Sequence, residues 1–205
     1  MSMLNLDTMD DMHYDVLREI GNIGAGNATT ALSQMVNMKL DMHVPMVQLL
    51  GFDELAGHIC GEESLVVGIY LFLEGDIDGS MMFMLEKESA KCLVNHLMGQ
   101  MGNPDSDEFS EMELSAMQEI GNIIAGAYLS ALSSLTQMTI TSSVPFMSID
   151  MAAAILSVPA IEFGKVGDKA LLIETEFGDD IMIKGYFILI PELESYDQIL
   201  GSLGL

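Results

Sequence analysis

Basic residues are scarce in this chain of 205 residues. Seven Lys and Arg stand against 31 Asp and Glu, which gives a formal net charge of -24. So acidic a surface repels the phosphates of nucleic acids and anionic lipids, and we therefore expect neither nucleic acid nor a membrane surface as a partner. The charge would also keep the chain monomeric and attract basic patches of protein partners. Adaptation to a saline or acid-biased proteome is an equally open explanation.

Tryptophan is absent and aromatic residues make up only 6% of the chain, whereas 19 Met residues are present. A core with this composition is built mainly from thin, flexible side chains. The length and the 50% content of hydrophobic residues are enough to bury a substantial core, so we expect the chain to fold on its own.

Cysteine and long apolar runs are also rare. Cys60 and Cys92 lie in unrelated segments without C-x-x-C spacing, and no signal-peptide pattern precedes residue 15. These features favour a reducing, cytoplasmic location. The longest apolar stretches, 65–73 and 181–191, are too short to span a bilayer and are predicted to be buried strands.

Motifs for bound cofactors are missing. The glycine-rich segment 21–27, GNIGAGN, follows no predicted strand and is not followed by Lys, which excludes a Rossmann or P-loop site. The four His residues are scattered and form no metal-binding pattern, so we expect no metal and no cofactor in this chain, and a metal-dependent hydrolase lacks its ligands. No Ser lies in a nucleophile-elbow motif.

The sequence contains an internal duplication. Residues 18–45 read REIGNIGAGNATTALSQMVNMKLDMHVP, and residues 118–145 read QEIGNIIAGAYLSALSSLTQMTITSSVP. The following residues recur 100 positions later: Glu19, Ile20, Gly21, Asn22, Ile23, Ala25, Gly26, Ala31, Leu32, Ser33, Met38, Val44 and Pro45. A weaker echo relates the segments that begin at Gly79 and Gly185, at an offset of 106. We therefore expect one domain, 1–205, made of two repeats, about 9–99 and 110–205, joined by a polar linker at about 100–109.

Periodicity predicts the secondary structure. Two long helices are expected at about 9–37 and 110–138, the second with a capping box formed by Ser110 and Glu113. Shorter helices are expected at 86–98, 150–157 and 192–203, and strands at 40–50, 65–74, 78–85, 140–149, 169–177 and 181–190. The pattern predicts an α+β fold with internal pseudo-twofold symmetry, in which helices cover a mainly antiparallel sheet.

A polar stripe recurs on the two long helices. Asp15, Glu19 and Asn22 have the spacing i, i+4 and i+7, which places them on one side of a helix, and Ser115, Glu119 and Asn122 repeat it. An exposed helix has polar residues on its outside in any case, which is the simplest explanation of one such stripe. The Glu and Asn persist in both copies, however, while neighbouring positions differ, and this favours a functional face.

The glycines of these helices, Gly21, Gly24, Gly26, Gly121 and Gly126, need an explanation, because each costs roughly 1 kcal/mol relative to Ala. Either close packing requires them, or their missing side chains clear room for a partner beside the asparagines. The sequence leaves both explanations open.

The two stripes, each followed 22 residues after its Asn by Pro45 or Pro145, resemble the active-site pattern of the CheC/CheX/FliY phosphatases. The resemblance covers nearly the whole chain, and two copies without an additional domain are similar to CheC-type members. It implies a CheC-like fold and a protein phosphatase of chemotaxis that hydrolyses the aspartyl phosphate of phosphorylated CheY.

The resemblance also implies roles for the residues. Glu19, Asn22, Glu119 and Asn122 would be catalytic, because an Asn amide can orient the attacking water and a Glu one turn earlier can pair with the active-site Lys of the receiver. Such positioning predicts an acceleration on the order of 10²-fold. Asp15, Ser115, Pro45 and Pro145 would lie at the periphery of the motif. The receiver would supply its own Mg²⁺.

A second partner implied by the resemblance is the receptor deamidase CheD. The segment 150–156, with Asp150 at an expected helix start, is a candidate surface for it, and a buried helix is the alternative. The main rival function is a non-catalytic adaptor that binds CheY-type receivers, CheD or flagellar-switch proteins. We expect a monomer, because each repeat finds its symmetric mate within the chain.

Overall fold

The computed structural model describes residues 11–36, 41–99, 106–162, 169–177 and 183–204. The helices and strands in these ranges follow in the order α1 (Asp11–Val36), β1 (Met42–Gly51), α2 (Phe52–Ile59), β2 (Leu65–Gly75), β3 (Gly79–Glu86), α3 (Lys87–Leu97), α4 (Glu111–Thr136), β4 (Ile140–Ser142), β5 (Phe146–Met151), α5 (Ala152–Glu162), β6 (Lys169–Phe177), β7 (Ile183–Pro191) and α6 (Leu193–Ser202).

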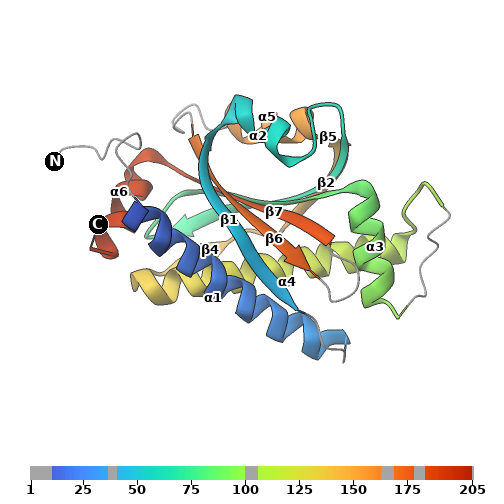
Figure 1. Cartoon of the computed structure of the whole chain (residues 1–205), viewed down its shortest axis with the longest axis horizontal. Helices are drawn as coiled ribbons and strands as arrows, with labels where there is room; N and C mark the ends of the chain where they lie inside the picture. The colour runs from blue at the N-terminus through green and yellow to red at the C-terminus, as the bar shows by residue number, and fades with distance from the viewer. Residues whose placement is uncertain (1–10, 37–40, 100–105, 163–168, 178–182, 205) are drawn as a thin grey trace.

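All the strands join one antiparallel sheet with the order β1-β6-β7-β3-β2-β4, and β5 also pairs with β2. Helices cover both faces of this sheet (Figure 1). The predicted α+β class, with long and short helices on a mainly antiparallel sheet, is therefore confirmed.

The strand order reads the same from either end when the two repeats are exchanged. β1 of the first repeat pairs with β6 of the second, and β5 of the second pairs with β2 of the first. In the two hairpins, Ile69 pairs with Phe83 and Ile173 pairs with Phe187, so each repeat contributes one antiparallel hairpin to the sheet. Phe83 and Phe187 face each other across the central β3–β7 pair.

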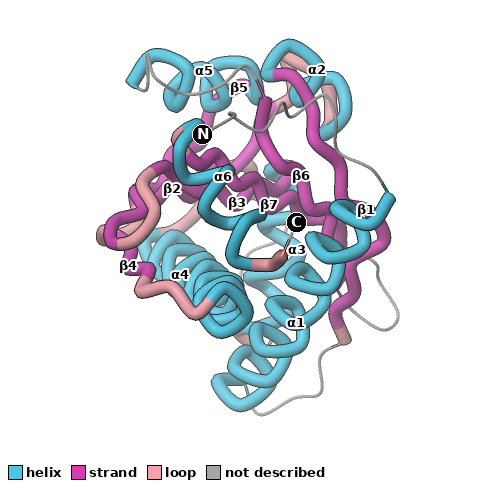
Figure 2. Tube along the Cα trace, turned by 90° about the vertical axis from the view of Figure 1, so that its left-hand side faces the viewer, coloured by secondary structure: helices cyan, strands magenta, loops and turns pink. Residues whose placement is uncertain are grey.

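The helices divide into two layers. α1 and α4 lie side by side and run in opposite directions beneath one face of the sheet, and α2 and α5 cover the other face (Figures 1 and 2). Each layer has its own buried cluster: the larger joins α1, α3, α4 and α6 to the sheet, and the smaller joins α2 and α5 to it. The sheet therefore separates two cores, one under each helical layer.

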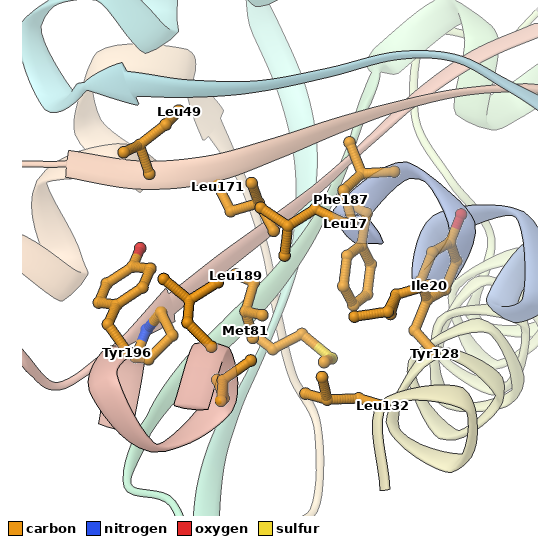
Figure 3. Close-up of a pocket in the computed structure, with 14 residues that line it drawn as sticks. Leu17, Ile20, Leu49, Met81, Tyr128, Leu132, Leu171, Phe187, Leu189 and Tyr196 are labelled. Carbon is orange, nitrogen blue, oxygen red and sulfur yellow. The ribbon is translucent and has the colours of Figure 1, made fainter. Parts of the chain in front are cut away.

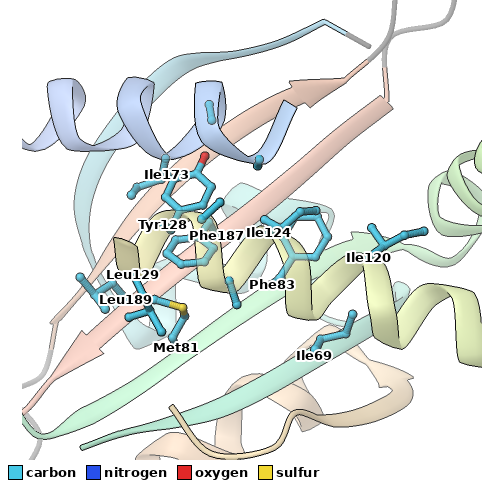
Figure 4. Close-up of a cluster of buried hydrophobic side chains, with 14 of the residues drawn as sticks. Ile69, Met81, Phe83, Ile120, Ile124, Tyr128, Leu129, Ile173, Phe187 and Leu189 are labelled. Atoms are coloured by element: carbon cyan, nitrogen blue, oxygen red, sulfur yellow. The ribbon is translucent and has the colours of Figure 1, made fainter. Parts of the chain in front are cut away.

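The contact between α1 and α4 depends on one glycine and one tyrosine. A Cβ atom on Gly24 would lie 2.6 Å from the Tyr128 ring, so the two helices approach closely at this point. The ring stacks on Phe187 with centroids 4.2 Å apart (Figure 4). Its hydroxyl is 3.1 Å from the Thr175 hydroxyl. Burial raises the pKa of Tyr128 to about 12. This cluster fixes both long helices against the sheet.

A small cavity lies in the same layer, between α1, α4, α6 and the sheet. Its volume is about 30 Å³ and its walls are apolar side chains, among them Leu17, Leu132 and Leu189 (Figure 3). It lies beneath the helices, on the side away from the polar stripes, and we interpret it as a packing gap rather than a ligand site.

Most predicted elements match the observed ones within a few residues, with two exceptions. α2 was not expected. The predicted strand 140–149 is divided into β4 and β5, because Pro145 has no N–H to donate and the Ser143 side chain accepts the hydrogen bond of Phe72 N at 3.0 Å. Residues 9, 10, 37 and 100–105, which include most of the predicted linker, lie outside the described residues.

The start of α4 has the predicted capping box. Ser110 Oγ accepts a hydrogen bond from Glu113 N, and a Glu113 carboxylate oxygen accepts one from Ser110 N at 2.8 Å. This arrangement fixes the first turn of the helix that carries the second stripe. Among the described residues, no helix is long and apolar enough to cross a membrane.

Candidate functional site

The first polar stripe lies on the outer side of α1. Asp15, Glu19 and Asn22 are all exposed, whereas Leu17 and Ile20 between them are buried against the sheet. The helical spacing therefore places the charged and amide groups where a partner can reach them, as predicted.

The second stripe occupies the equivalent place on α4. Ser115, Glu119 and Asn122 are exposed, whereas Met117 and Ile120 are buried. Burial of both Asn side chains would have excluded a catalytic role, but Asn22 and Asn122 are both exposed.

The two stripes point away from each other. Asn22 lies about 160° around α1 from Gly24, the residue that meets α4, because successive residues are rotated by about 100°. On α4, Tyr128 is the residue that meets Gly24, and Asn122 lies about 120° around the helix from it. Each Asn is therefore directed away from the other helix, and the domain has two separate candidate sites on opposite flanks.

The residues around the two stripes differ in charge. At the first site, Arg18 Nη1 donates to Asp15 Oδ1 at 2.8 Å on the exposed surface. At the second site, the equivalent residues are Gln118 and Ser115, and Gln118 Nε2 donates to the carbonyl oxygen of Pro145 at 3.3 Å. Among the described residues, the first site thus has an ion pair beside its Glu and the second has none.

The two prolines occupy similar but not identical positions. Pro45 lies exposed within β1, at the register shift between His43 and Met46 in the β1–β6 pairing. Pro145 is partly buried and immediately precedes β5. The two prolines therefore have the same place in the repeat, but only Pro45 lies inside a strand.

Close packing explains some of these glycines and not others. A Cβ on Gly121 would lie 2.2 Å from Ile69 of the sheet, and one on Gly21 would touch Val44 and Ile173 at 3.4 Å. Close packing thus requires Gly24 and Gly121, whereas a Cβ at Gly21 would make ordinary van der Waals contact. By contrast, a Cβ on Gly26 or Gly126 would meet nothing within 4 Å.

Asp150 does not begin a helix, contrary to the expectation. It lies in β5 opposite Val66, and its carboxylate accepts a hydrogen bond from Met151 N at 2.8 Å. The following helix, α5, starts at Ala152 and buries Ile155 and Leu156 in the smaller core cluster. Within the segment 150–156, Ala152, Ile155 and Leu156 therefore belong to the core, whereas Asp150, Met151 and Ala153 are exposed.

An apolar sheet edge beside Asp150 was not foreseen. β5 pairs only with β2 among the described strands and exposes Phe146, Ile149 and Met151. A cavity of about 350 Å³ lies between this edge and α5. The alternation of residues 146–151 could have indicated the strand, but not that it forms an edge.

The described part of the chain contains no group of three or more His, Cys, Asp or Glu side chains placed to hold a metal ion. The stripes themselves expose amides and carboxylates, which can position a partner's groups and water through hydrogen bonds and ion pairs.

A duplicated α+β domain with one exposed Glu/Asn stripe on each of two antiparallel helices is the class defined by this fold and site. Thermotoga maritima FliY has the same fold: its crystal structure superimposes with a TM-score of 0.75 at 22% identity, covering 96% of this chain and 98% of that one.

The chain belongs to the CheC-like family, whose model matches residues 12–48 and 112–149. The Bacillus subtilis CheY-P phosphatase CheC is 39% identical over 197 residues, which cover 93% of both chains. The B. subtilis flagellar motor switch phosphatase FliY is 29% identical over 140 residues, 68% of this chain and 36% of that protein. Both matched segments contain a complete stripe together with its proline, whereas Asp150 lies just outside the second.

Proposed function

We propose that this protein is a chemotaxis phosphatase that hydrolyses the aspartyl phosphate of phosphorylated CheY. The observation that carries the proposal is the exposure of the same Glu/Asn pair at equivalent positions of α1 and α4. The names of two relatives, CheY-P phosphatase CheC and flagellar motor switch phosphatase FliY, support it.

Asn22 and Asn122 orient the attacking water. An amide offers a carbonyl oxygen that accepts a hydrogen bond from the water and an N–H that donates to a phosphoryl oxygen. The water oxygen then forms a bond to phosphorus as the bond to the receiver's aspartate oxygen breaks, which leaves a carboxylate and inorganic phosphate. Because the acyl phosphate is already activated, placing the water in line supplies most of what the reaction needs.

Glu19 and Glu119 dock the receiver. Each lies one turn before its Asn on the same exposed face, so a carboxylate that pairs with the receiver's active-site Lys brings the Asn to the phosphoryl group. Asp15 and Ser115, one turn earlier, contact the rim of the receiver. The chain itself binds no cofactor, and Mg²⁺ in the receiver supplies the charge neutralisation of the phosphoryl group.

The chain works as a monomer in the cytoplasm with two independent sites. The orientation of the two sites toward opposite flanks supports their independence, because a receiver docked on α1 does not lie over the Asn of α4. Pro45 and Pro145 border the two sites, and Pro145 is connected to α4 through Gln118.

CheD is the second partner, and we place its contact at the edge of β5. The unpaired side of this strand and the exposed Phe146, Ile149 and Met151 are suited to a protein partner, and Asp150 lies among them.

A non-catalytic adaptor is the alternative function. The decay of phosphorylated CheY, measured with and without the protein, separates the two. A phosphatase accelerates the release of inorganic phosphate at substoichiometric concentrations, whereas an adaptor binds beryllofluoride-activated CheY and leaves the decay rate unchanged. Binding without acceleration would therefore replace the proposed function by the adaptor.

A further inference from the structure

Gly26 and Gly126 lie one turn beyond the two site asparagines, and nothing within the described chain explains them. We propose that they are specificity-determining positions of the docking face. Their missing side chains let the receiver lie close over α1 or α4 while the Asn reaches the phosphoryl group. The inference rests on the proposed function and adds two residues to it.

The first argument is the lack of an internal reason. Where packing requires glycine, as at Gly24 and Gly121, an added Cβ would lie 2.6 Å and 2.2 Å from the nearest side-chain atom. At Gly26 and Gly126 an added Cβ would have nothing within 4 Å, and both residues are exposed. A side chain at either position would fit the isolated protein.

The second argument is that glycine is unfavourable there and yet recurs. Glycine in the middle of a helix favours unfolding relative to alanine, because it loses more conformational freedom on folding. Gly57 of α2 is another exposed helical glycine with empty space around it, but Ser157 stands 100 positions later. Among the glycines that the structure describes, an internally unnecessary helical glycine recurs in both repeats only on the two stripes.

The third argument is position. On a helical projection Gly26 lies about 40° from Asn22 and about 20° from Glu19, so the three residues share one outer face. The same holds for Gly126, Asn122 and Glu119. A receiver that contacts the Glu and the Asn therefore extends over the glycine, where a side chain would hold it away from the helix.

The fourth argument is the shape of the second site. Gly126 borders an open groove of about 750 Å³ between α4 and β4. Small uncharged side chains, including Ser130, Ser133 and Thr141, line this groove. The surface beyond Asn122 is thus hollowed where Gly126 lies, which suits the approach of a convex partner surface.

The test compares two variants made in the full chain. The double variant Gly26→Gln with Gly126→Gln places a helix-favouring side chain on both stripes, and Gly57→Gln makes the same change on the opposite face of the sheet. The rate of phosphate release is measured as a function of the concentration of phosphorylated CheY, and the thermal midpoint is recorded for each protein.

We expect the stripe variant to need about tenfold more phosphorylated CheY for its half-maximal rate, the factor that corresponds to about 1.4 kcal/mol. Its thermal midpoint should equal or exceed that of the wild type, and Gly57→Gln should keep wild-type kinetics. If the stripe variant loses activity through misfolding, its thermal midpoint will fall below that of the wild type. In that case the kinetic test uses Gly26→Ala with Gly126→Ala, which adds only a methyl group to each helix.

Unchanged kinetics in a folded stripe variant would overturn the inference and leave the proposed function intact. If the wild-type protein itself failed to accelerate phosphate release, the proposed function would be wrong, and the inference would fall with it. The wild-type measurement in the same assay therefore distinguishes the two failures.

Discussion

Replacing Gly24 with alanine should destabilise the domain, although alanine is the better helix former. The added Cβ would lie 2.6 Å from Cδ1, 2.9 Å from Cγ and 3.0 Å from Cε1 of the Tyr128 ring. The ring cannot retreat, because it stacks on Phe187 and its hydroxyl is held by Thr175. The two long helices must therefore separate, or the stacked pair must shift into the sheet.

The magnitude follows from two opposing terms. Overpacking of a well-packed contact costs about 1–3 kcal/mol, and replacement of a helical glycine by alanine contributes about 1 kcal/mol of stability. Gly26→Ala, two residues further along the same helix, has the second term without the first. The difference in unfolding free energy between the two variants therefore isolates the steric term, and we expect Gly26→Ala to be the more stable by about 1–3 kcal/mol.

Urea denaturation followed by circular dichroism measures this difference, and thermal midpoints should differ by about 2–4 °C per kcal/mol for a chain of this size. Equal stability of the two alanine variants would refute the close contact between α1 and α4. The orientation of the two sites away from each other, which depends on that contact, would then lose its basis.

Two further predictions concern pH and charge. Burial raises the pKa of Tyr128 to about 12, so the folded state holds the phenol proton more tightly than the unfolded state, and the stability that is present below pH 10 is lost as the pH rises toward 12. Tyr128→Phe should therefore reduce the loss of unfolding free energy by about 1.4 kcal/mol per pH unit in this range. An unchanged pH dependence of stability in alkaline denaturation would contradict the burial of Tyr128. Glu19→Lys with Glu119→Lys should weaken the binding of beryllofluoride-activated CheY by about tenfold or more, because each new Lys would meet the receiver's active-site Lys. The matched Glu→Gln pair should lose less affinity, and equal losses of affinity in a binding titration would exclude the pairing of Glu with that Lys.

Periodicity predicted the elements that pack in an ordinary way. The strand expected at 169–177 coincides with β6, and the long helices end within a few residues of their expected ends. The division of 140–149 at Pro145 could not be inferred with confidence from alternation alone, because it depends on how Ser143 meets β2 across the sheet. Edge position depends in the same way on the partners that a strand finds in the fold.

α2 could have been predicted. Phe52, Leu55, Ala56 and Ile59 have the spacing i, i+3, i+4 and i+7, which is typical of an amphipathic helix. The duplication offered a second signal, because the helix expected at 150–157 lies 100 residues after this segment. A helix of only eight residues is unstable in isolation, but burial of the apolar side of α2 against α5 and the sheet stabilises it in the folded chain.

The exposed face of the site was readable from the sequence, because helical spacing alone places Glu19 and Asn22 opposite Leu17 and Ile20. The roles of the glycines could not be predicted from the sequence, because the same residue type allows close packing at Gly24 and borders open space at Gly26. Only the positions of neighbouring atoms separate these two cases.

The most direct test of the catalytic proposal is the double variant Asn22→Ala with Asn122→Ala, assayed for phosphate release from phosphorylated CheY and for binding to beryllofluoride-activated CheY. We expect release to fall to the rate of the receiver alone while binding stays nearly intact, and each single variant to keep part of the activity, because the sites lie on different helices. Acceleration that persists in the double variant would contradict the assignment of water positioning to the two asparagines.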